Sequence, residues 1–253
     1  MRYTFGDTTT ADERLRKIAD FFNPLASAFI SEHIQTAINS ALDLGCGPGY
    51  TTDMLAKTTK AGTVTGIDIS DNFLESAGNR FQNYHFVKYD IRNMPLPVKA
   101  DIIYFRFLLS HLENIRQLVE GWMSALTRGG YLIIDELEDI YTDSEVFKTY
   151  LSVNDGLIKS QGANLYIGKQ LDQELNGLNI FQNVSALIPV NDHLAASWFF
   201  PNTISVWEKE EWVRNNLNQS DRKKISDELL KISENPSEKS SITWRMRKII
   251  LQA

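Results

Sequence analysis

A glycine-rich turn carries the residue types and the spacing that point most directly to chemistry. Residues 42–50 read LDLGCGPGY, so that Gly45, Gly47 and Gly49 separate a short apolar run from a polar stretch suited to a helix. Glycine lets the backbone turn sharply and lets a ligand approach the main chain. In an open α/β sheet such a turn lies at the carboxyl end of a strand, where ligands bind. We therefore expect a ligand site at this turn.

The spacing of these glycines separates two classes of ligand. It is G-x-G-x-G, whereas the turn that seats a dinucleotide pyrophosphate on a helix N-terminus has the pattern G-x-G-x-x-G. Pro48 also stands where the pyrophosphate-binding turn needs exposed N–H groups, and proline has none. A dinucleotide-dependent oxidoreductase is therefore the disfavoured alternative.

Three aspartates are expected beside the turn. Asp43 lies in the apolar run before it, and Asp68 and Asp90 follow the next two apolar runs. Each alone could be structural: Asp68 as a helix cap, Asp90 as a turn residue before Pro95. Together with the glycine turn, however, three carboxylates at the ends of successive strands predict a cofactor site.

Strands and helices alternate through the middle of the chain, and this alternation predicts the sheet that positions the glycine turn. Such alternation implies parallel strand pairing and an α/β, doubly wound sheet with helices on both faces. The apolar runs predict strands at residues 41–44, 63–69, 84–89, 101–107 and 131–135, with helices from 51, at 71–81 and at 113–126.

The two ends of the chain depart from this alternation. A capping box at Thr10–Glu13 predicts a first helix, and Asn23-Pro24 predicts its end and the start of a second helix. Past Asp139 the pattern becomes mainly helical, which predicts insertions that cover the sheet. The expected helices are 144–159, 169–178, 202–217 and 221–232, and the expected strands are 184–190 and 243–251.

From about residue 41 to 136 the chain resembles the class I S-adenosylmethionine-dependent methyltransferases. The glycine turn resembles their first motif, and Leu126-Thr127-Arg128-Gly129-Gly130 resembles their L-x-P-G-G turn with Arg128 in place of proline. The resemblance implies a seven-stranded, mostly parallel Rossmann-like sheet with an antiparallel last strand. It also implies S-adenosyl-L-methionine as cofactor and S-adenosyl-L-homocysteine as product. We expect one domain, with residues 1–40 as a helical lid, 41–136 as the cofactor-binding core and 137–253 as insertions and closing strands.

The resemblance also implies roles for individual residues. The backbone of the glycine turn would meet the methionine part of the cofactor, and Asp43 would position its amino group. Asp68 would bind the ribose hydroxyls, and Asp90 with Ile91 would receive the adenine. The end of the fourth strand would lie near the methyl group. The cofactor-binding residues expected are Asp43, Gly45, Cys46, Gly47, Gly49, Tyr50, Asp68, Ile69, Asp90, Ile91, Phe105 and Arg106.

The sequence offers fewer candidates for binding the methyl acceptor than for binding the cofactor. Methyl transfer needs alignment and exclusion of water, and aromatic rings can hold a sulfonium by cation–π attraction. Tyr3 and Phe5 precede the first helix and are expected in a lid over the acceptor, unless the terminus is merely packed or frayed. His111 follows the fourth strand and is a candidate general base, although a histidine there could equally be structural.

Composition favours a small-molecule acceptor. The net charge is −6, with 26 basic and 32 acidic residues, and no long basic patch suggests nucleic acid. An acidic group near Asp135 and Asp139 could suggest Mg²⁺, but Arg106 on the adjacent strand argues against a metal. No segment reaches the ~20 apolar residues of a membrane helix, and the single cysteine, Cys46, fits a reducing cytoplasm.

These observations predict a methyltransferase that acts on an oxygen or nitrogen of a small molecule, as a monomer or homodimer. Two alternatives remain open from the sequence. One is a methyltransferase acting on a macromolecule, tRNA or protein, and the other is a protein that binds the cofactor without catalysis.

Overall fold

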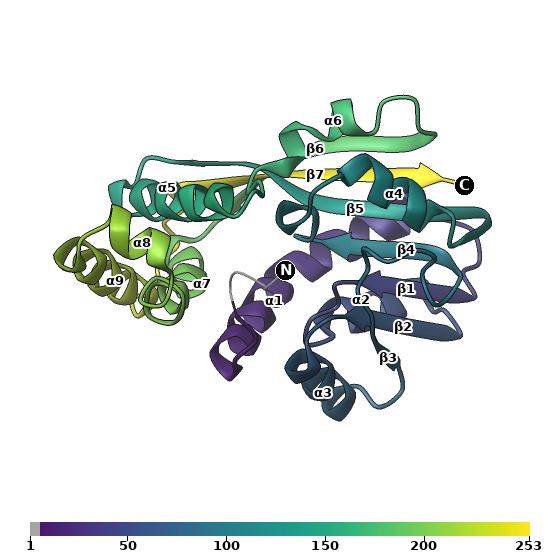
Figure 1. Cartoon of the computed structure of the whole chain (residues 1–253), viewed down its shortest axis with the longest axis horizontal. Coiled ribbons are helices and arrows are strands. Elements are labelled where there is room, and N and C mark those ends of the chain that lie inside the picture. Colours follow the sequence, from purple (N-terminus) through teal and green to yellow (C-terminus); the bar gives the residue numbers. More distant parts are fainter. Residues whose placement is uncertain (1–5) are drawn as a thin grey trace.

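A seven-stranded sheet forms the centre of the computed structural model, which describes residues 6–253 (Figure 1). The strand order is β3-β2-β1-β4-β5-β7-β6. β1 to β5 pair in parallel, whereas β7 runs antiparallel to both of its neighbours. This confirms the predicted mixed sheet with an antiparallel last strand. The strands are β1 Ser40–Leu44, β2 Thr63–Asp68, β3 His85–Lys88, β4 Ala100–Arg106, β5 Leu126–Thr142, β6 Ile180–Val190 and β7 Ile242–Gln252.

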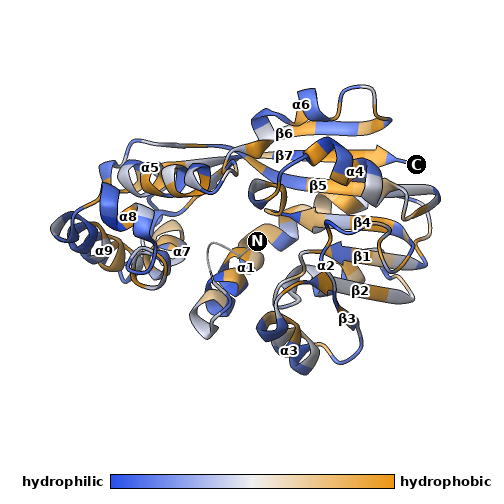
Figure 2. Ribbon diagram, viewed as in Figure 1, coloured by the Kyte–Doolittle hydropathy of each residue, from blue (hydrophilic) through white to orange (hydrophobic). Residues whose placement is uncertain are grey.

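Helices pack on both faces of the sheet because consecutive residues of the central strands point to opposite faces. Along β4, Ile102 and Tyr104 pack with α1 and α2, whereas Ile103 and Phe105 pack with α4. Figure 2 shows hydrophobic residues concentrated on these central strands. The described helices are α1 Thr9–His33, α2 Tyr50–Thr59, α3 Asp71–Arg80, η1 Leu109–His111, α4 Ile115–Met123, α5 Glu145–Ser160, η2 Ile167–Lys169, α6 Leu171–Glu174, α7 Asp192–Ser205, α8 Glu211–Asn216 and α9 Gln219–Ser233.

The first helix corrects two expectations. α1 is continuous through Pro24, and its N-cap is Thr8, whose side chain accepts a hydrogen bond from the Ala11 N–H, rather than Thr10. A proline inside a helix costs about 3 kcal/mol. α1 tolerates this because residues on both sides of Pro24, including Phe22 and Phe29, are buried on one face of the helix. Tertiary burial therefore overrides the local signal to stop.

Strand β5 is much longer than the sequence indicated. It covers 17 residues, and its second half pairs with the first half of β7 as far as Thr142 and Ile242. The charged residues after Asp135 do not indicate a strand by themselves, because the residues of β7 that they pair with lie more than a hundred positions away. The extended β5–β7 pair leads to a helical lobe made of α5, α7, α8 and α9 (Figure 1).

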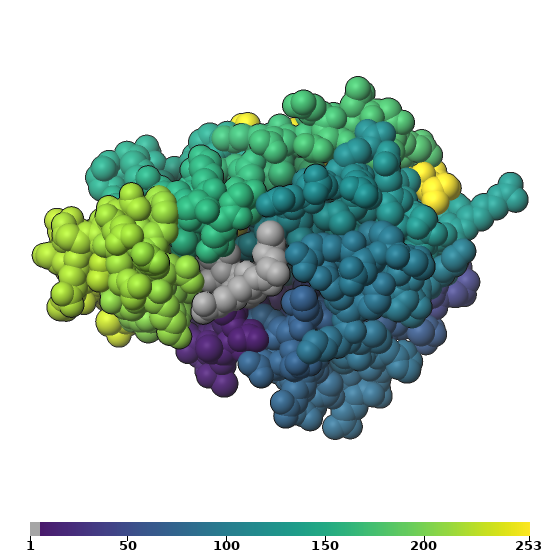
Figure 3. Space-filling model, in the orientation of Figure 1, coloured from purple at the N-terminus to yellow at the C-terminus, as the bar shows by residue number. Residues whose placement is uncertain are grey.

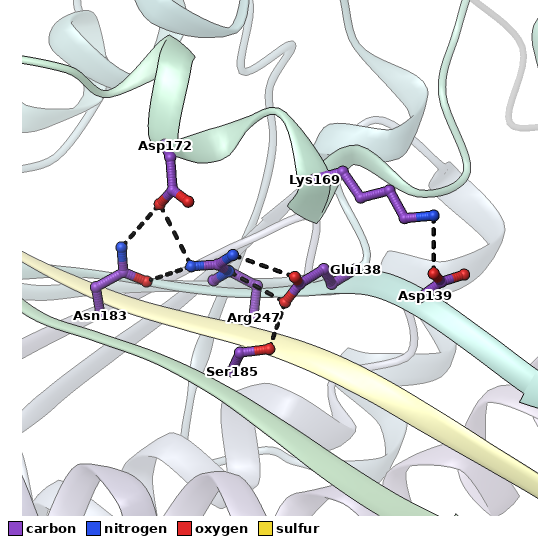
Figure 4. A network of polar contacts seen from close by, with 7 residues as sticks. All are labelled: Glu138, Asp139, Lys169, Asp172, Asn183, Ser185 and Arg247. Atoms are coloured by element: carbon purple, nitrogen blue, oxygen red, sulfur yellow. Dashed lines mark hydrogen bonds and ion pairs between the residues drawn. The ribbon is translucent and has the colours of Figure 1, made fainter.

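A polar network fixes the η2–α6 segment to this pair of strands (Figure 4). Glu138 stands at a register shift of β5, and both of its carboxylate oxygens accept from Arg247, at 3.2 Å each. Arg247 also reaches Asn183 of β6 at 3.0 Å and Asp172 of α6 at 3.3 Å. The bulge re-aims the Glu138 side chain, so that one carboxylate ties three elements together. Ser185 and the Lys169–Asp139 ion pair complete the network.

The helical lobe encloses an aromatic core. Trp198, Trp207 and Trp244 are buried, and Tyr150 stacks on Phe199 with ring centroids 4.2 Å apart. These tryptophans therefore form a core and not an association surface. The expected helix at 202–217 is in fact the end of α7 followed by α8, and the expected helix at 169–178 contains only η2 and α6. No helix in the described part of the chain is long and apolar enough to cross a membrane.

An ion pair buried between β5 and β7 provides a test of this architecture. Lys248 Nζ lies 2.7 Å from Asp135 Oδ1, and Tyr104 donates to the other carboxylate oxygen at 3.0 Å. Removing one partner of a buried pair leaves an uncompensated charge and costs about 3–5 kcal/mol. We expect Lys248→Met to lower the free energy of unfolding by this amount in urea titrations.

The matched control is Lys57→Met, because Lys57 forms an exposed i,i+4 pair with Asp53. Its effect should stay within about 0.5 kcal/mol. Adding Asp135→Asn to Lys248→Met should recover much of the lost stability. Equal stabilities of the two lysine variants would contradict the structural role of the buried pair.

Candidate functional site

A cavity of about 530 Å³ runs along the carboxyl ends of β1, β2 and β4. The glycine turn forms its floor, and α1 lies between the sheet and the helical lobe beside it (Figures 1 and 3). The other walls come from the segments after β2, β3 and β4 and from the end of α7. Its lining includes Gly6–Thr8, Leu15, Ile18, Ala19, Gly45–Pro48, Tyr50, Thr51, Asp68–Ser70, Phe73, Tyr89–Arg92, Arg106–Leu108, His111, Leu112, Ser205, Val206, Lys209 and Glu210.

The turn after β1 has a backbone that only glycine adopts easily. Gly45, Gly47 and Gly49 have φ values of +67°, +51° and +86°. A Cβ at Gly49 would also lie about 3 Å from side chains of α3 and β3. The turn is held from the side by β2, because the Gly47 N–H donates to Asp68 Oδ2 at 2.8 Å. The turn therefore presents main chain, and no side chain, to most of the cavity floor.

Asp68 lies in the cavity wall as the sequence predicted. Its second oxygen, Oδ1, accepts from the Ser70 N–H at 2.9 Å. Burial raises the pKa of the carboxyl, and the backbone donors at Ser70 and Gly47 oppose that rise. Each carboxylate oxygen keeps a further lone pair, so that Asp68 can accept from two hydroxyls of a ligand.

Asp43 lies behind the turn and not in the cavity wall. Its Oδ2 accepts from the hydroxyls of Thr51 and Thr52, both at 2.7 Å, and burial raises its pKa to about 6. The aspartate therefore fixes the start of α2, and its predicted contact with a cofactor amino group stays a prediction. Phe105 and Gly49 also lie outside the lining. Thr51, which sequence reasoning missed, lies in it.

Asp90 and Ile91 form one end of the cavity. Asp90 is bound by the side chain of Arg92, with Nε 2.8 Å from Oδ1, and this arginine holds the pKa of the carboxyl below its usual range. The Ile91 carbonyl accepts from the buried Trp122 indole at 2.8 Å. Arg92, two residues after the predicted acid, also lines the cavity, and no sequence pattern pointed to it.

The segment after β4 is shaped by a buried glutamate. Glu136 Oε1 accepts from the N–H groups of Leu108 and Leu109, at 2.7 and 2.9 Å, and Phe107 has a φ of +54°. Burial raises the Glu136 pKa to about 8. This contact fixes the backbone that carries His111 into the cavity wall, where burial lowers the pKa of the imidazole to about 4.

The start of α1 is bound to the cofactor half of the fold. Asp12 accepts from the Tyr50 hydroxyl at 2.7 Å and from Arg80 at 3.1 Å. Asp7 accepts from the Ser70 hydroxyl at 2.8 Å. These contacts hold the residues after Gly6 beside the cavity, where a lid was expected. Tyr3 and Phe5, the aromatic residues proposed for that lid, lie outside the described residues.

The acidic residues of β5 are already engaged. Asp135 pairs with Lys248, and Glu138 and Asp139 pair with Arg247 and Lys169. Within residues 6–253, no group of three or more histidine, cysteine, aspartate or glutamate side chains could hold a metal ion.

Part of the chain is similar to a known protein family. Residues 42–134 match the family model described as a methyltransferase domain. The glycine turn and the carboxylate on β2 lie in that segment. This part of the chain is therefore similar to a methyltransferase domain.

Several relatives carry the same name. The chain is 31% identical over 139 residues to the trans-aconitate 2-methyltransferase of Rhizobium rhizogenes. These aligned residues make up 53% of this chain and 50% of the relative. It is 38% identical over 101 residues to the enzyme of that name from Paracidovorax citrulli, covering 39% of each chain. The chain thus spans half or less of the length of these relatives.

Solved structures show the same fold. A coclaurine N-methyltransferase bound to N-methylheliamine and S-adenosylhomocysteine superposes with a TM-score of 0.57 at 16% identity, covering 98% of this chain and 75% of the other. A plantazolicin methyltransferase in complex with S-adenosylhomocysteine gives a TM-score of 0.53 at 16% identity, covering 96% and 88%.

The cavity fits S-adenosylmethionine. A Cβ at Gly45 would meet Leu108 Cδ1 at 2.7 Å, whereas the space beside Gly47 holds only ordinary contacts, with Leu15 at 3.8 Å and Phe73 at 4.0 Å. Asp68 can accept from two ribose hydroxyls. Ile69, whose side chain is 47% exposed, presents an apolar surface for the adenine beside Ile91. The residues of this chain can therefore hold the nucleoside and the methionine ends of the cofactor.

Asp68 provides the test of cofactor placement. Asp68→Ala removes both the ribose acceptor and the brace on Gly47, so that the affinity for S-adenosylhomocysteine should fall about 100-fold or more in calorimetry. Asp71→Ala is the control, because Asp71 is exposed on α3 and pairs with Lys88. Unchanged affinity in Asp68→Ala would refute the placement.

Glu136 gives a prediction about pH. Its pKa is about 8 in the folded chain, against 4.5 for an unperturbed glutamate. Between these values the folded state retains a proton that the unfolded state releases, so that this group makes stability fall as pH rises from 4.5 to about 8. Glu136→Gln cannot ionise, and its stability relative to wild type should increase across that range in urea titrations. A constant difference would contradict the raised pKa.

Proposed function

We propose that this protein is a methyltransferase that transfers the methyl group of S-adenosylmethionine to an oxygen of a small carboxylic acid. The observation that carries the proposal is the cofactor cavity after β1, which continues past Arg106 to His111 and the end of α7. The relatives named trans-aconitate 2-methyltransferase support a carboxylate acceptor.

The protonation state of the cavity supports this choice of acceptor. His111 has a pKa of about 4, so that it is neutral at neutral pH and a weak proton acceptor. A hydroxyl or an ammonium acceptor would need to lose a proton, whereas a carboxylate is already ionised. The expectation that His111 is a general base is therefore weakened, and we propose that it acts as a neutral wall of the acceptor site.

The chain must then align the acceptor carboxylate with the methyl group of the cofactor. Bound S-adenosylmethionine supplies an electrophilic methyl group on a positive sulfonium. The glycine turn and Asp68 would hold its two ends. Phe107, and Leu108 with its N–H bound to Glu136, would border the transfer path. An acceptor carboxylate oxygen forms the new C–O bond while the methyl–sulfur bond breaks and its electron pair returns to sulfur. Positioning of this kind can supply about 7–11 kcal/mol of the barrier.

We propose further that the acceptor is not a nucleic acid, which the net charge of −6 supports. The buried, unpaired thiol of Cys46 supports a cytoplasmic location. A monomer or a homodimer stays a prediction, as does the division of the chain into one domain with a lid and helical insertions.

The direct test is transfer of labelled methyl groups. The protein is incubated with radiolabelled S-adenosylmethionine and separate pools of carboxylic acids, phenols and amines. We expect base-labile methyl esters from the acid pool only. Label in phenols or amines would overturn the carboxylate acceptor, and tight cofactor binding with no transfer to any pool would favour the non-catalytic alternative.

His111 distinguishes alignment from base catalysis. With a carboxylate acceptor, His111→Gln should lower kcat by less than about 5-fold, because no proton is removed in the step. A general base contributes typically 10²–10⁴-fold. Steady-state release of S-adenosylhomocysteine measures kcat for the wild type and for the variant. A fall in kcat of about 100-fold with unchanged cofactor affinity would contradict the proposal.

A further inference from the structure

One cationic side chain of intermediate exposure lies in the cavity wall, and one of its nitrogen atoms is buried. Arg106 is the last residue of β4 and lines the cavity. Its Nη2 donates to Asn23 Oδ1 of α1 at 2.9 Å. Its Nη1 is buried and has no hydrogen-bond partner within the described residues. Because buried donors are almost always paired, this N–H calls for an acceptor from outside the described residues, which a ligand in the cavity can supply.

The surroundings do not neutralise this cation. Asp43 and Glu136 are near enough to interact electrostatically with Arg106, but neither is hydrogen-bonded to it. Burial raises the Glu136 pKa to about 8, so that this carboxyl is mainly neutral near neutral pH. Asp43, with a pKa of about 6, stays mainly ionised, and its Oδ2 accepts from Thr51 and Thr52. An anion entering the cavity would therefore meet a positive group that the protein leaves incompletely balanced.

The guanidinium is also held in one orientation. Its central carbon lies 5.8 Å from the ring centre of Phe22 and 5.7 Å from that of Phe107. Asn23 is fixed in turn, because its amide nitrogen donates to the Tyr50 carbonyl at 3.0 Å. A planar, oriented guanidinium matches the geometry of a carboxylate better than that of any single-point acceptor.

We propose that Arg106 is the anion subsite of the acceptor, and that its Nη1 binds a carboxylate that is not the one methylated. This inference rests on the proposed methyltransferase function and names a more specific substrate class. Its supporting residues Phe22 and Asn23 lie outside the segment 42–134 that matches the methyltransferase family. That position suits a subsite for a particular acceptor rather than for the shared cofactor.

The chemistry then requires at least two carboxylates in the acceptor. A carboxylate paired with the Arg106 guanidinium has its lone pairs engaged and is a poor nucleophile. A second carboxylate, held at a distance from Arg106, keeps its electrons free to form the C–O bond. The expected acceptors are therefore di- and tricarboxylates, and the expected products are their monomethyl esters.

The experiment measures two affinities separately in the intact chain. Calorimetry gives the affinity for S-adenosylhomocysteine, and titration of the protein saturated with it gives the affinity for trans-aconitate and for crotonate, a monocarboxylate. Arg106→Gln should weaken trans-aconitate binding about 100-fold and leave the affinity for S-adenosylhomocysteine within about 3-fold. The preference for trans-aconitate over crotonate should collapse in the same variant.

Two further variants keep the test decisive. Arg16→Gln removes the same charge from an exposed position on α1, where Arg16 pairs with Asp20, and it should bind all three ligands as wild type does. Asn23→Ala leaves the charge of Arg106 but releases its orientation, and it should weaken trans-aconitate binding by about 10-fold. If Arg106→Gln fails to fold, trans-aconitate binding by Asn23→Ala tests the proposal instead.

The outcomes separate this inference from the proposed function. A loss of S-adenosylhomocysteine affinity in Arg106→Gln with unchanged trans-aconitate binding would overturn the subsite and assign Arg106 to the methionine carboxylate. Equal binding of all ligands by Arg106→Gln and wild type would also overturn it. Failure of wild type to bind trans-aconitate, with S-adenosylhomocysteine still bound, would overturn the subsite and leave the methyltransferase standing.

Discussion

The antiparallel pairing of β5 with β7 is the interaction on which both halves of the molecule depend. Its first half closes the sheet beside β4, and its second half extends beyond the sheet to the helical lobe. The buried Lys248–Asp135 pair and the Glu138–Arg247 pair lie along this ladder. Because one pair of strands serves both regions, the position of the lobe relative to the glycine turn follows from the strand register.

That register determines what faces the cavity. Glu136 is placed by β5 and fixes the backbone of Leu108 and Leu109 in the segment after β4. On the other side, α1 brings Asn23 against Arg106 and Asp12 against Tyr50. The cofactor end of the cavity is thus built from local strand-turn-helix units. The acceptor end is assembled from three distant parts of the chain.

The sequence anticipated the cofactor end far better than the acceptor end. Gly47 and Asp68 were predictable because a short, regular spacing places them at adjacent strand ends. Arg106 was expected among the cofactor-binding residues, and nothing in its neighbourhood along the chain indicated its contact with Asn23, 83 positions away. The continuity of α1 through Pro24 and the length of β5 were missed for the same reason. Each depends on burial against residues that are remote in sequence.

The sequence by itself determined the alternation of strands and helices, the parallel half of the sheet, the glycine turn and the carboxylate on β2. These follow from local periodicity and from the backbone freedom of glycine, which act over a few residues. Only the tertiary structure decided that Asp43 lies behind the turn and that Asp90 is paired with Arg92. It also decided that the buried Nη1 of Arg106 finds no hydrogen-bond partner among residues 6–253. These depend on desolvation and on contacts between distant segments, and such contacts exist only once the chain has folded.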